Sequence, residues 1–105
     1  MKVYNTLTAK LDNFTSINSN EVKMYLCGPT VYDSGHLGHG RSAVAFDVIA
    51  KYFAYKGYKV LYVSNYTDID DKMIDRAAKL NITVKELADK IIPEYERDYG
   101  ALGVT

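Results

Sequence analysis

The chain has 105 residues and a mass of 11.8 kDa, which suits one domain and is too short for two. Hydrophobic residues (48%) and charged residues (25%) occur at ordinary globular levels and the formal net charge is zero, which excludes a disordered chain and a global basic field for nucleic acid. The single cysteine excludes an intramolecular disulfide framework, and no apolar run suits a membrane span or signal segment, so we expect a cytoplasmic protein without membrane contact.

The first part of the chain predicts three short strands. Residues 3–8 mix β-branched and aromatic side chains, and residues 11–17 alternate in a way that would let them pair with the first strand. A polar cluster at 18–20 then interrupts the pattern. Residues 22–27 (VKMYLC) form a stronger strand, because apolar side chains recur at every second position.

The next segment predicts a βαβ unit. Residues 28–40 hold four of the seven glycines and are expected to form a loop. Residues 41–56 show helical periodicity, with Asp47 and Lys51 on the solvent side. The apolar face predicted for this helix consists of Val44, Ala45, Val48, Ile49, Tyr52 and Phe53. Residues 58–64 predict a strand whose central residues 60–63 are apolar on both faces, as in a strand between two layers. A right-handed crossover would place it parallel to residues 22–27.

The remainder predicts two helices. Residues 69–80 carry an apolar stripe, and Asn81 is suited to end that helix. Thr83 and Glu86 have the spacing of a capping box for a last helix. Pro93 lies inside that helix, where we expect a kink or a restart.

The tetrapeptide HLGH at residues 36–39 carries the most chemistry. It lies between the end of a strand and the start of a helix, where nucleotides bind in open α/β sheets and where free N–H groups attract phosphate. His36 and His39 could both point at one phosphate and stabilise charge that develops on phosphorus. Gly38 leaves room for a planar base to approach the backbone.

Other interpretations of this loop stay open. The two histidines could be a metal pair, although no further ligand lies near them in the sequence, or they could be exposed and inert. A dinucleotide-binding loop is disfavoured, because Gly35, Gly38 and Gly40 give GxxGxG, the reverse of the required pattern.

Three further features have a structural and a functional interpretation. The ten tyrosines favour core and rim filling over a base-stacking surface. The acids Asp68, Asp70 and Asp71 could bind Mg²⁺, but the start of a helix is the favoured interpretation. Cys27, taken alone, would be a small buried hydrophobe.

Taken together, the motifs resemble the N-terminal part of cysteinyl-tRNA synthetases along nearly the whole chain. The motifs that carry the resemblance are YNTLT (4–8), MYLCGPTVYD (24–33), HLGH (36–39), FDV (46–48) and NYTDIDDK (65–72). HLGH stands where HIGH is commoner. The resemblance implies an α/β fold of the Rossmann type, similar to the HIGH-motif nucleotidyl transferases. In this fold, helices flank a parallel sheet. Residues 1–105 would be the first half of that catalytic domain, with no second domain.

The resemblance also implies a chemistry. The family activates L-cysteine with ATP and Mg²⁺ to cysteinyl-adenylate, and then transfers the cysteinyl group to tRNA(Cys). His36 and His39 would hold the triphosphate as catalytic residues, and Gly38 would admit the adenine. Cys27 matches the first ligand of a zinc ion that binds the substrate thiol and so distinguishes cysteine from serine. The expected cysteine- or adenylate-binding positions are Cys27, Gly28, Thr30 and Thr67.

Synthetases of this family are several times longer than this chain. The other zinc ligands, the KMSKS-type loop and the tRNA-binding region are not found in the sequence, so we expect the front part of an enzyme with little activity of its own. An exposed sheet edge would favour self-association. Two other functions stay open: a cysteine ligase that acts on an amine-bearing sugar acceptor, and a truncated, non-catalytic nucleotide-binding module.

Overall fold

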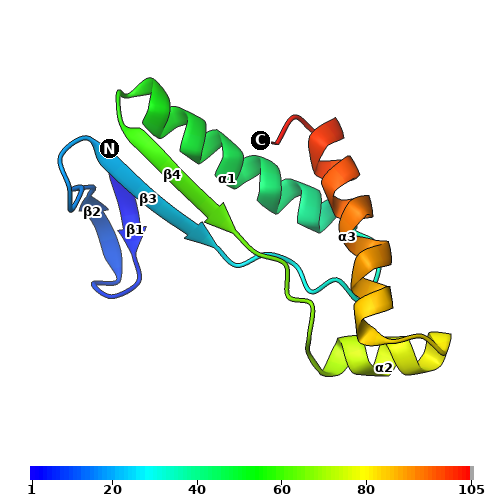
Figure 1. Cartoon of the computed structure of the whole chain (residues 1–105). Coiled ribbons are helices and arrows are strands. Elements are labelled where there is room, and N and C mark those ends of the chain that lie inside the picture. The colour runs from blue at the N-terminus through cyan, green and yellow to red at the C-terminus, as the bar shows by residue number, and fades with distance from the viewer. Residues whose placement is uncertain (105) are drawn as a thin grey trace.

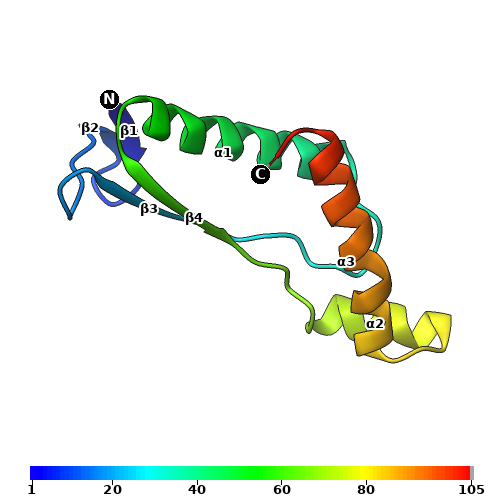
Figure 2. The same ribbon diagram turned by 45° about the horizontal axis from the view of Figure 1, so that its top comes forward.

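Two small sheets and three helices make up the computed structural model, which describes residues 1–104 (Figure 1). The strands are β1 (Lys2–Asn5), β2 (Lys10–Asn13), β3 (Glu21–Leu26) and β4 (Lys59–Ser64), and the helices are α1 (Leu37–Tyr55), α2 (Asp71–Leu80) and α3 (Val84–Ala101). Strands β3 and β4 run beside α1, and α3 stands across the end of this layer with α2 beyond it (Figures 1 and 2).

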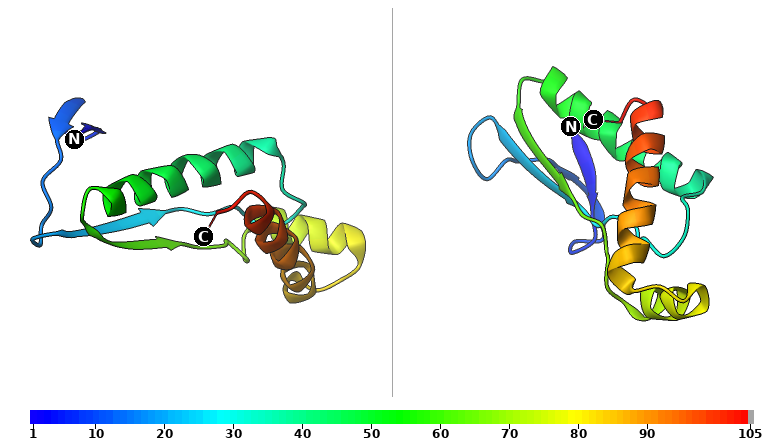
Figure 3. Two further views of the ribbon diagram at one scale, coloured as in Figure 1. Left: turned by 90° about the horizontal axis from the view of Figure 1, so that it is seen from above. Right: turned by 45° about the vertical axis from the view of Figure 1, so that its right-hand side comes forward.

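The N-terminal hairpin confirms the first predicted pairing. Strands β1 and β2 are antiparallel, although both are shorter than the sequence suggests. Side chains close the turn between them, because the hydroxyl of Thr8 donates to the Asp12 carboxylate over 2.7 Å. The hairpin projects from the far end of β3, away from α2 and α3 (Figure 3). It therefore takes no part in the site described below.

The predicted parallel βαβ unit is confirmed. Strands β3 and β4 pair in parallel from Glu21 opposite Lys59 to Leu26 opposite Ser64, and α1 connects them. Gly57 follows the C-terminus of α1 with a φ of +95°, a conformation that an L side chain rarely adopts. The chain can therefore turn directly from α1 into β4.

Helix α1 differs from the sequence prediction at its start. It begins at Leu37, four residues before the predicted residue 41, so HLGH forms the N-cap and first turn and does not lie in a loop. The reason is local: the side chain of His36 caps the helix, a role that sequence rules assign to serine, threonine, aspartate or asparagine.

The buried face of α1 also differs from the prediction. Asp47, expected in solvent, is only 7% exposed and is buried together with Ala43 and Phe53. By contrast, Val48 of the predicted inner face is 58% exposed. The helix is apolar on most of its circumference, so periodicity alone did not select the packed side. Lys51 pairs with Asp47 over 2.5 Å and neutralises the carboxylate at the helix surface.

One face of the β3–β4 sheet is covered by α1 and the other is open in the part of the chain that the structure describes. Tyr25, Leu61 and Val63 lie on this open face and are 66%, 53% and 46% exposed. The prediction that residues 58–64 lie between two layers therefore does not hold for residues 1–104.

The two C-terminal helices begin and end much as predicted. Asp70 is the N-cap of α2 and accepts a hydrogen bond from Met73 N over 2.9 Å, and Asn81 ends this helix in the left-handed conformation. Thr83 is the N-cap of α3. Helix α3 continues through Pro93, so the predicted restart does not occur. Pro93 lies on the exposed side, where the loss of one backbone donor leaves the packed side of the helix intact.

The main hydrophobic core lies where α2 and α3 meet the loop that follows β3. Its buried members are Val31, Met73, Ala77, Leu87, Ala88, Ile91 and Tyr95. The loop is tied to the segment after β4 by a parallel bridge, in which Val31 N donates to Thr67 O and Thr67 N donates to Pro29 O. This core therefore supports the HLGH turn from the side of α3.

Candidate functional site

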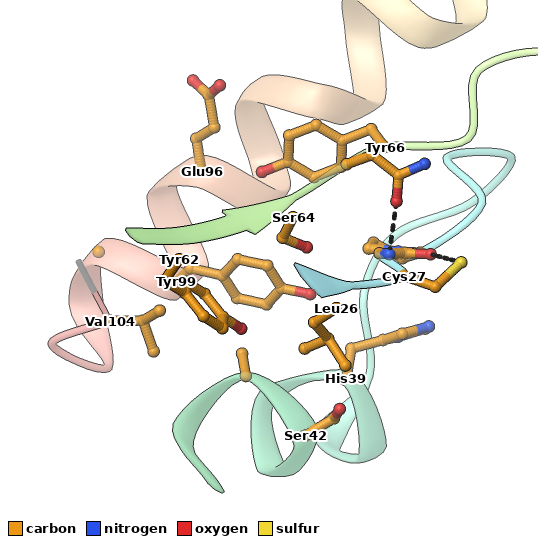
Figure 4. A pocket seen from close by; sticks show the side chains of 15 residues that line it. Leu26, Cys27, His39, Ser42, Tyr62, Ser64, Tyr66, Glu96, Tyr99 and Val104 are labelled. Atoms are coloured by element: carbon orange, nitrogen blue, oxygen red, sulfur yellow. Dashed lines mark hydrogen bonds between the residues drawn. The ribbon is translucent and has the colours of Figure 1, made fainter. Parts of the chain in front are cut away.

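A cavity of about 500 Å³ opens at the carboxyl ends of the two parallel strands. Cys27 follows β3 and Tyr62 belongs to β4, while α1 contributes His39 and Ser42 (Figure 4). Helix α3 closes the opposite side with Tyr99. Such an edge of an α/β sheet is where ligands commonly bind, because the strand ends and the first turn of the following helix meet there.

The floor of the cavity is a close contact between the two strand ends. Gly28 N donates to Asn65 Oδ1 over 2.7 Å. A Cβ atom at Gly28 would lie 1.5 Å from the carbonyl oxygen of Asn65, so no other residue fits without a backbone shift. Of the other predicted positions, Thr30 and Thr67 form the backbone bridge just beyond the cavity and do not line it.

His36 and His39 cap the start of α1 reciprocally. Nδ1 of His36 accepts from Gly38 N over 3.1 Å, and Nδ1 of His39 accepts from His36 N over 3.1 Å. The two rings contact each other with centroids 3.9 Å apart and an interplanar angle of 32°. A ring whose Nδ1 accepts a hydrogen bond is neutral and carries its proton on Nε2. Both imidazoles can therefore offer an Nε2–H to an anion.

Gly38 has a role in this cap that the sequence did not suggest. A Cβ atom there would lie 2.9 Å from Cε1 and 3.0 Å from Nδ1 of His36. The absence of a side chain lets the His36 ring fold over the first turn. Room for a nucleotide base at the same position stays a prediction.

The electrostatics of the site favour a neutral His39. Burial lowers the pKa of His39, and the neighbouring His36 lowers it further, because two adjacent imidazoles resist double protonation. The first turn of α1 contains no acidic residue that would repel an anion from the helix N-terminus. Burial raises the pKa of Tyr62, Tyr66 and Tyr99, so the tyrosines of the cavity wall remain neutral hydrogen-bonding groups.

The structure brings Cys27 and the histidine turn together at one edge of the cavity. Cys27 and His39 line the same cavity, and their side chains lie at the same end of it in Figure 4. His36 and His39 both line an adjoining smaller cavity of about 130 Å³. Cys27 is free and exposed, which rules out the buried-hydrophobe interpretation of its side chain.

Metal binding finds little support from this chain's own side chains. Within residues 1–104, no three histidine, cysteine, aspartate or glutamate residues are arranged to hold a metal ion. Cys27 could supply one zinc ligand at most, whereas protein zinc sites use at least three. Nδ1 of each histidine is already engaged by the backbone. Asp70 caps α2, which supports the helix-start interpretation of its acid cluster over a Mg²⁺ site.

Several lining residues were missed by the sequence reasoning. Asn65 stands directly after β4, and a polar side chain at a strand end is a signal that could have identified it. Tyr62 and Tyr66 were assigned only to general packing. Tyr99 comes from a helix 60 residues after His39, and no local pattern predicts that contact.

A parallel βαβ unit whose helix starts with a histidine cap beside a cavity defines an α/β protein with a candidate ligand site at its strand ends. Residues 13–105 match the family model described as "tRNA synthetases class I (C) catalytic domain". The chain therefore belongs to this family of class I synthetase catalytic domains. The structure shows an α/β unit with a small parallel sheet of two strands. Residues 1–104 do not show the full Rossmann-type sheet that the resemblance implies.

Curated relatives point the same way. The chain is 55% identical over 104 residues to the cysteine–tRNA ligase of Streptococcus mutans, and 56% identical over 105 residues to that of Thermodesulfovibrio yellowstonii. It is 53% identical to the cysteine–tRNA ligase of Enterococcus faecalis. These matches cover 99–100% of this chain but only 22–23% of each relative. Among residues 1–104, the structure contains no helix that is both long and apolar enough to span a membrane.

Proposed function

We propose that this chain forms the histidine-turn part of a cysteine–tRNA ligase, an enzyme that activates L-cysteine with ATP and transfers the product to tRNA(Cys). One observation carries the proposal: the reciprocal His36–His39 cap borders the cavity that also holds the Cys27 thiol. The identity of more than half to curated cysteine–tRNA ligases supports the same substrate pair. The proposed setting is the cytoplasm, without membrane contact.

The proposed catalytic work of the histidines is electrostatic. ATP bound with Mg²⁺ would place its phosphates at the first turn of α1, where the helix N-terminus and the two Nε2–H groups are available. Hydrogen-bond donors fixed in advance stabilise the negative charge that develops when cysteine carboxylate attacks the α-phosphorus. Pyrophosphate leaves, and cysteinyl-adenylate remains beside the cavity.

The strand ends are proposed to hold the amino-acid side of the adenylate. Gly28 leaves the backbone uncovered at the cavity floor, and Thr30 and Thr67 are locked beside it by the parallel bridge. Cys27 is proposed to contribute one ligand to a zinc ion whose other ligands lie outside residues 1–104. Because one thiolate cannot hold zinc tightly, the 105-residue chain by itself is expected to bind no stoichiometric zinc.

A chimera tests this proposal. The matching 104 residues of the Streptococcus mutans relative are replaced by this chain, and cysteine-dependent exchange between ATP and pyrophosphate is measured. We expect exchange and charging of tRNA(Cys). His36→Ala and His39→Ala should each reduce exchange by about 100-fold or more, the scale of losing one preorganised donor. Lys85→Ala, at an exposed surface pair, is the control that should leave activity unchanged.

Each other outcome of the chimera has a defined meaning. Exchange without tRNA charging would contradict the transfer step of the proposal and leave the amine-bearing sugar acceptor as the alternative. The non-catalytic module would be the remaining interpretation if two results are found together. The folded chimera would show no exchange, and the 105-residue chain would bind neither ATP nor a cysteinyl-adenylate analogue in calorimetry. Exchange that survives both alanine substitutions would refute the assignment of the histidines.

Self-association is proposed for the 105-residue chain in isolation. The two-stranded β3–β4 sheet leaves strand edges unpaired within the described residues, and its open face exposes Tyr25, Leu61 and Val63. Unpaired edges and apolar patches promote pairing between copies. Sedimentation velocity should show a concentration-dependent dimer or larger species, which Leu61→Lys weakens. A monodisperse monomer over the whole concentration range would contradict this.

A further inference from the structure

Tyr95 is buried against the histidine turn although it belongs to a distant helix. It lies in α3, is only 1% exposed, and its hydroxyl oxygen is 3.5 Å from Nδ1 of His39. The two rings meet edge to face, with centroids 5.4 Å apart and an interplanar angle of 80°. A fully buried tyrosine usually directs its hydroxyl group at a hydrogen-bond partner, and His39 is the partner found here.

The Tyr95 ring has little freedom to move. Tyr66 and Tyr99 contact it at centroid distances of 6.1 and 5.7 Å. On the loop side, a Cβ atom at Gly35 would already approach Tyr95 Cε1 to 3.1 Å. The preceding residue of the loop is fixed as well, because the hydroxyl of Ser34 donates to the Glu94 carboxylate over 2.7 Å. Helix α3 and the loop therefore hold the phenol in one place relative to His39.

Nδ1 of His39 thus receives two donors. The backbone N–H of His36 approaches at 3.1 Å, and the Tyr95 hydroxyl approaches at 3.5 Å. A neutral imidazole has one acceptor nitrogen, so two donors at Nδ1 both favour the form whose proton is on Nε2. Burial raises the pKa of Tyr95 to about 12, so the phenol keeps its proton at neutral pH and remains able to donate.

We propose that Tyr95 is a positioning residue, whose hydroxyl group holds the His39 ring with Nδ1 as an acceptor and Nε2–H directed outward for an anionic ligand. Tyr95 acts through His39 and does not touch the ligand. The ligand part of this proposal rests on the proposed function, whereas the tautomer and orientation of His39 do not.

Several other groups face His39 and could influence its pKa in a titration. The His36 ring contacts it from the same turn, and Asp98 and Tyr99 of α3 line the small cavity beside it. Cys27 lies at the same end of the larger cavity as His39. Asp98 also contacts Arg97 at 3.2 Å. Removal of the Tyr95 hydroxyl leaves all four of these facing groups in place, so a change at His39 would report on that hydroxyl.

Histidine NMR on the whole 105-residue chain tests the proposal without any activity. The chain has two histidines, so two sets of ring signals are expected, and His36→Gln assigns them. In the wild-type chain, ¹⁵N shifts should show Nδ1 of His39 unprotonated and Nε2 protonated. In Tyr95→Phe, the His39 pKa should rise by roughly 0.5 unit and the Nδ1–H tautomer should become about threefold more populated.

Tyr99→Phe is the matched control. It removes a neighbouring phenol of the same helix that contacts the Tyr95 ring but makes no hydrogen bond to His39 among those found in residues 1–104. It should leave the His39 tautomer unchanged. If Tyr95→Phe does not fold, 3-fluorotyrosine at position 95 replaces it, and this stronger donor should lower the His39 pKa. Unchanged His39 signals in the folded variant, or a protonated Nδ1 in the wild-type chain, would overturn the proposal.

The chimera described above separates this inference from the proposed function. There, Tyr95→Phe should lower kcat of exchange about fivefold with less effect on KM for ATP, and move the acidic limb of its pH profile upward. Tyr55→Phe, on the exposed side of α1, serves as the activity control. NMR changes in an inactive chimera would support positioning and refute the proposed function. An active chimera with unchanged His39 signals would refute positioning by Tyr95 and support the proposed function.

Discussion

Gly28 and Asn65 join the two parallel strands at the floor of the cavity, with Gly28 N 2.7 Å from Asn65 Oδ1. The contact is only possible because residue 28 has no side chain, since a Cβ atom would lie 1.5 Å from the Asn65 carbonyl oxygen. The same short contact fixes the positions of the segments that follow β3 and β4, which contain Cys27 and Tyr66. The close approach of the two strand ends beside the cavity therefore depends on Gly28.

Gly28→Ala is expected to destabilise the fold by at least about 3 kcal/mol, because backbone must move to relieve the overlap. Urea unfolding followed by circular dichroism measures this. Gly100→Ala is the control, since Gly100 lies in α3 and a Cβ atom there would meet no neighbouring side chain or loop within 4 Å. It should be neutral or stabilise by up to about 1 kcal/mol. Equal losses for both variants would show that the Gly28 contact has no special cost.

The Asp47–Lys51 pair should contribute far more than an equivalent surface pair. Asp47 is 7% exposed, and Lys51 also donates to Gly103 O over 3.2 Å, which links α1 to the end of α3. Lys51→Met would remove the cation that faces a buried carboxylate and should cost about 3 kcal/mol of unfolding free energy.

The Lys85–Asp89 pair gives a matched comparison. It has the same spacing and a 2.7 Å contact, but both side chains are mostly exposed. Lys85→Met should therefore change stability far less than Lys51→Met does. Similar losses in Lys51→Met and Lys85→Met would mean that burial of Asp47 does not matter.

The sequence predicted those features that depend on neighbours along the chain. The parallel pairing of β3 with β4 follows from local periodicity and a loop rich in glycine, and Asn81 and Thr83 mark helix ends by their own backbone chemistry. Contacts between distant segments were not predictable in this way. The buried side of α1 depends on its packing against β3, β4 and α3, and the wall of the cavity depends on α3 packing beside the histidine turn.

The site itself was predicted unevenly for a physical reason. Cys27, His36 and His39 belong to motifs that are contiguous in the sequence, so their proximity to one pocket edge could be inferred. The reciprocal cap could not, because histidine is not among the usual N-cap residues and nothing in HLGH specifies which ring nitrogen accepts.

Asp70 should act as a helix cap and its neighbour Asp68 should not. Asp70→Ala removes the acceptor for Met73 N and should cost about 1 kcal/mol. Asp68 is exposed and precedes the cap, so Asp68→Ala should stay within about 0.5 kcal/mol of wild type. Thermal unfolding with and without Mg²⁺ measures both effects. Stabilisation by Mg²⁺ that either variant abolishes would instead support a metal site at this turn.

His39 should make stability depend on pH in the mildly acidic range. Its pKa in the folded chain is lowered by burial and by His36, so the unfolded chain binds a proton more readily. The stabilisation is therefore complete above the unfolded value of about 6.5 and is lost as pH falls through the folded pKa. Protonation would also put a hydrogen on Nδ1 and break its hydrogen bond with His36 N.

His39→Gln isolates this effect. A glutamine at the third helical position can still accept from the N-cap N–H through its side-chain oxygen, as in an ordinary capping box, but it does not titrate. Urea unfolding between pH 7.5 and 5, a range centred near the ordinary histidine pKa of about 6.5, should show a smaller decline for the variant than for wild type. His36→Gln removes the neighbour that helps to lower the His39 pKa, so its decline should also be smaller than that of wild type. Parallel curves for wild type and His39→Gln would show that His39 does not control the acid sensitivity of the fold.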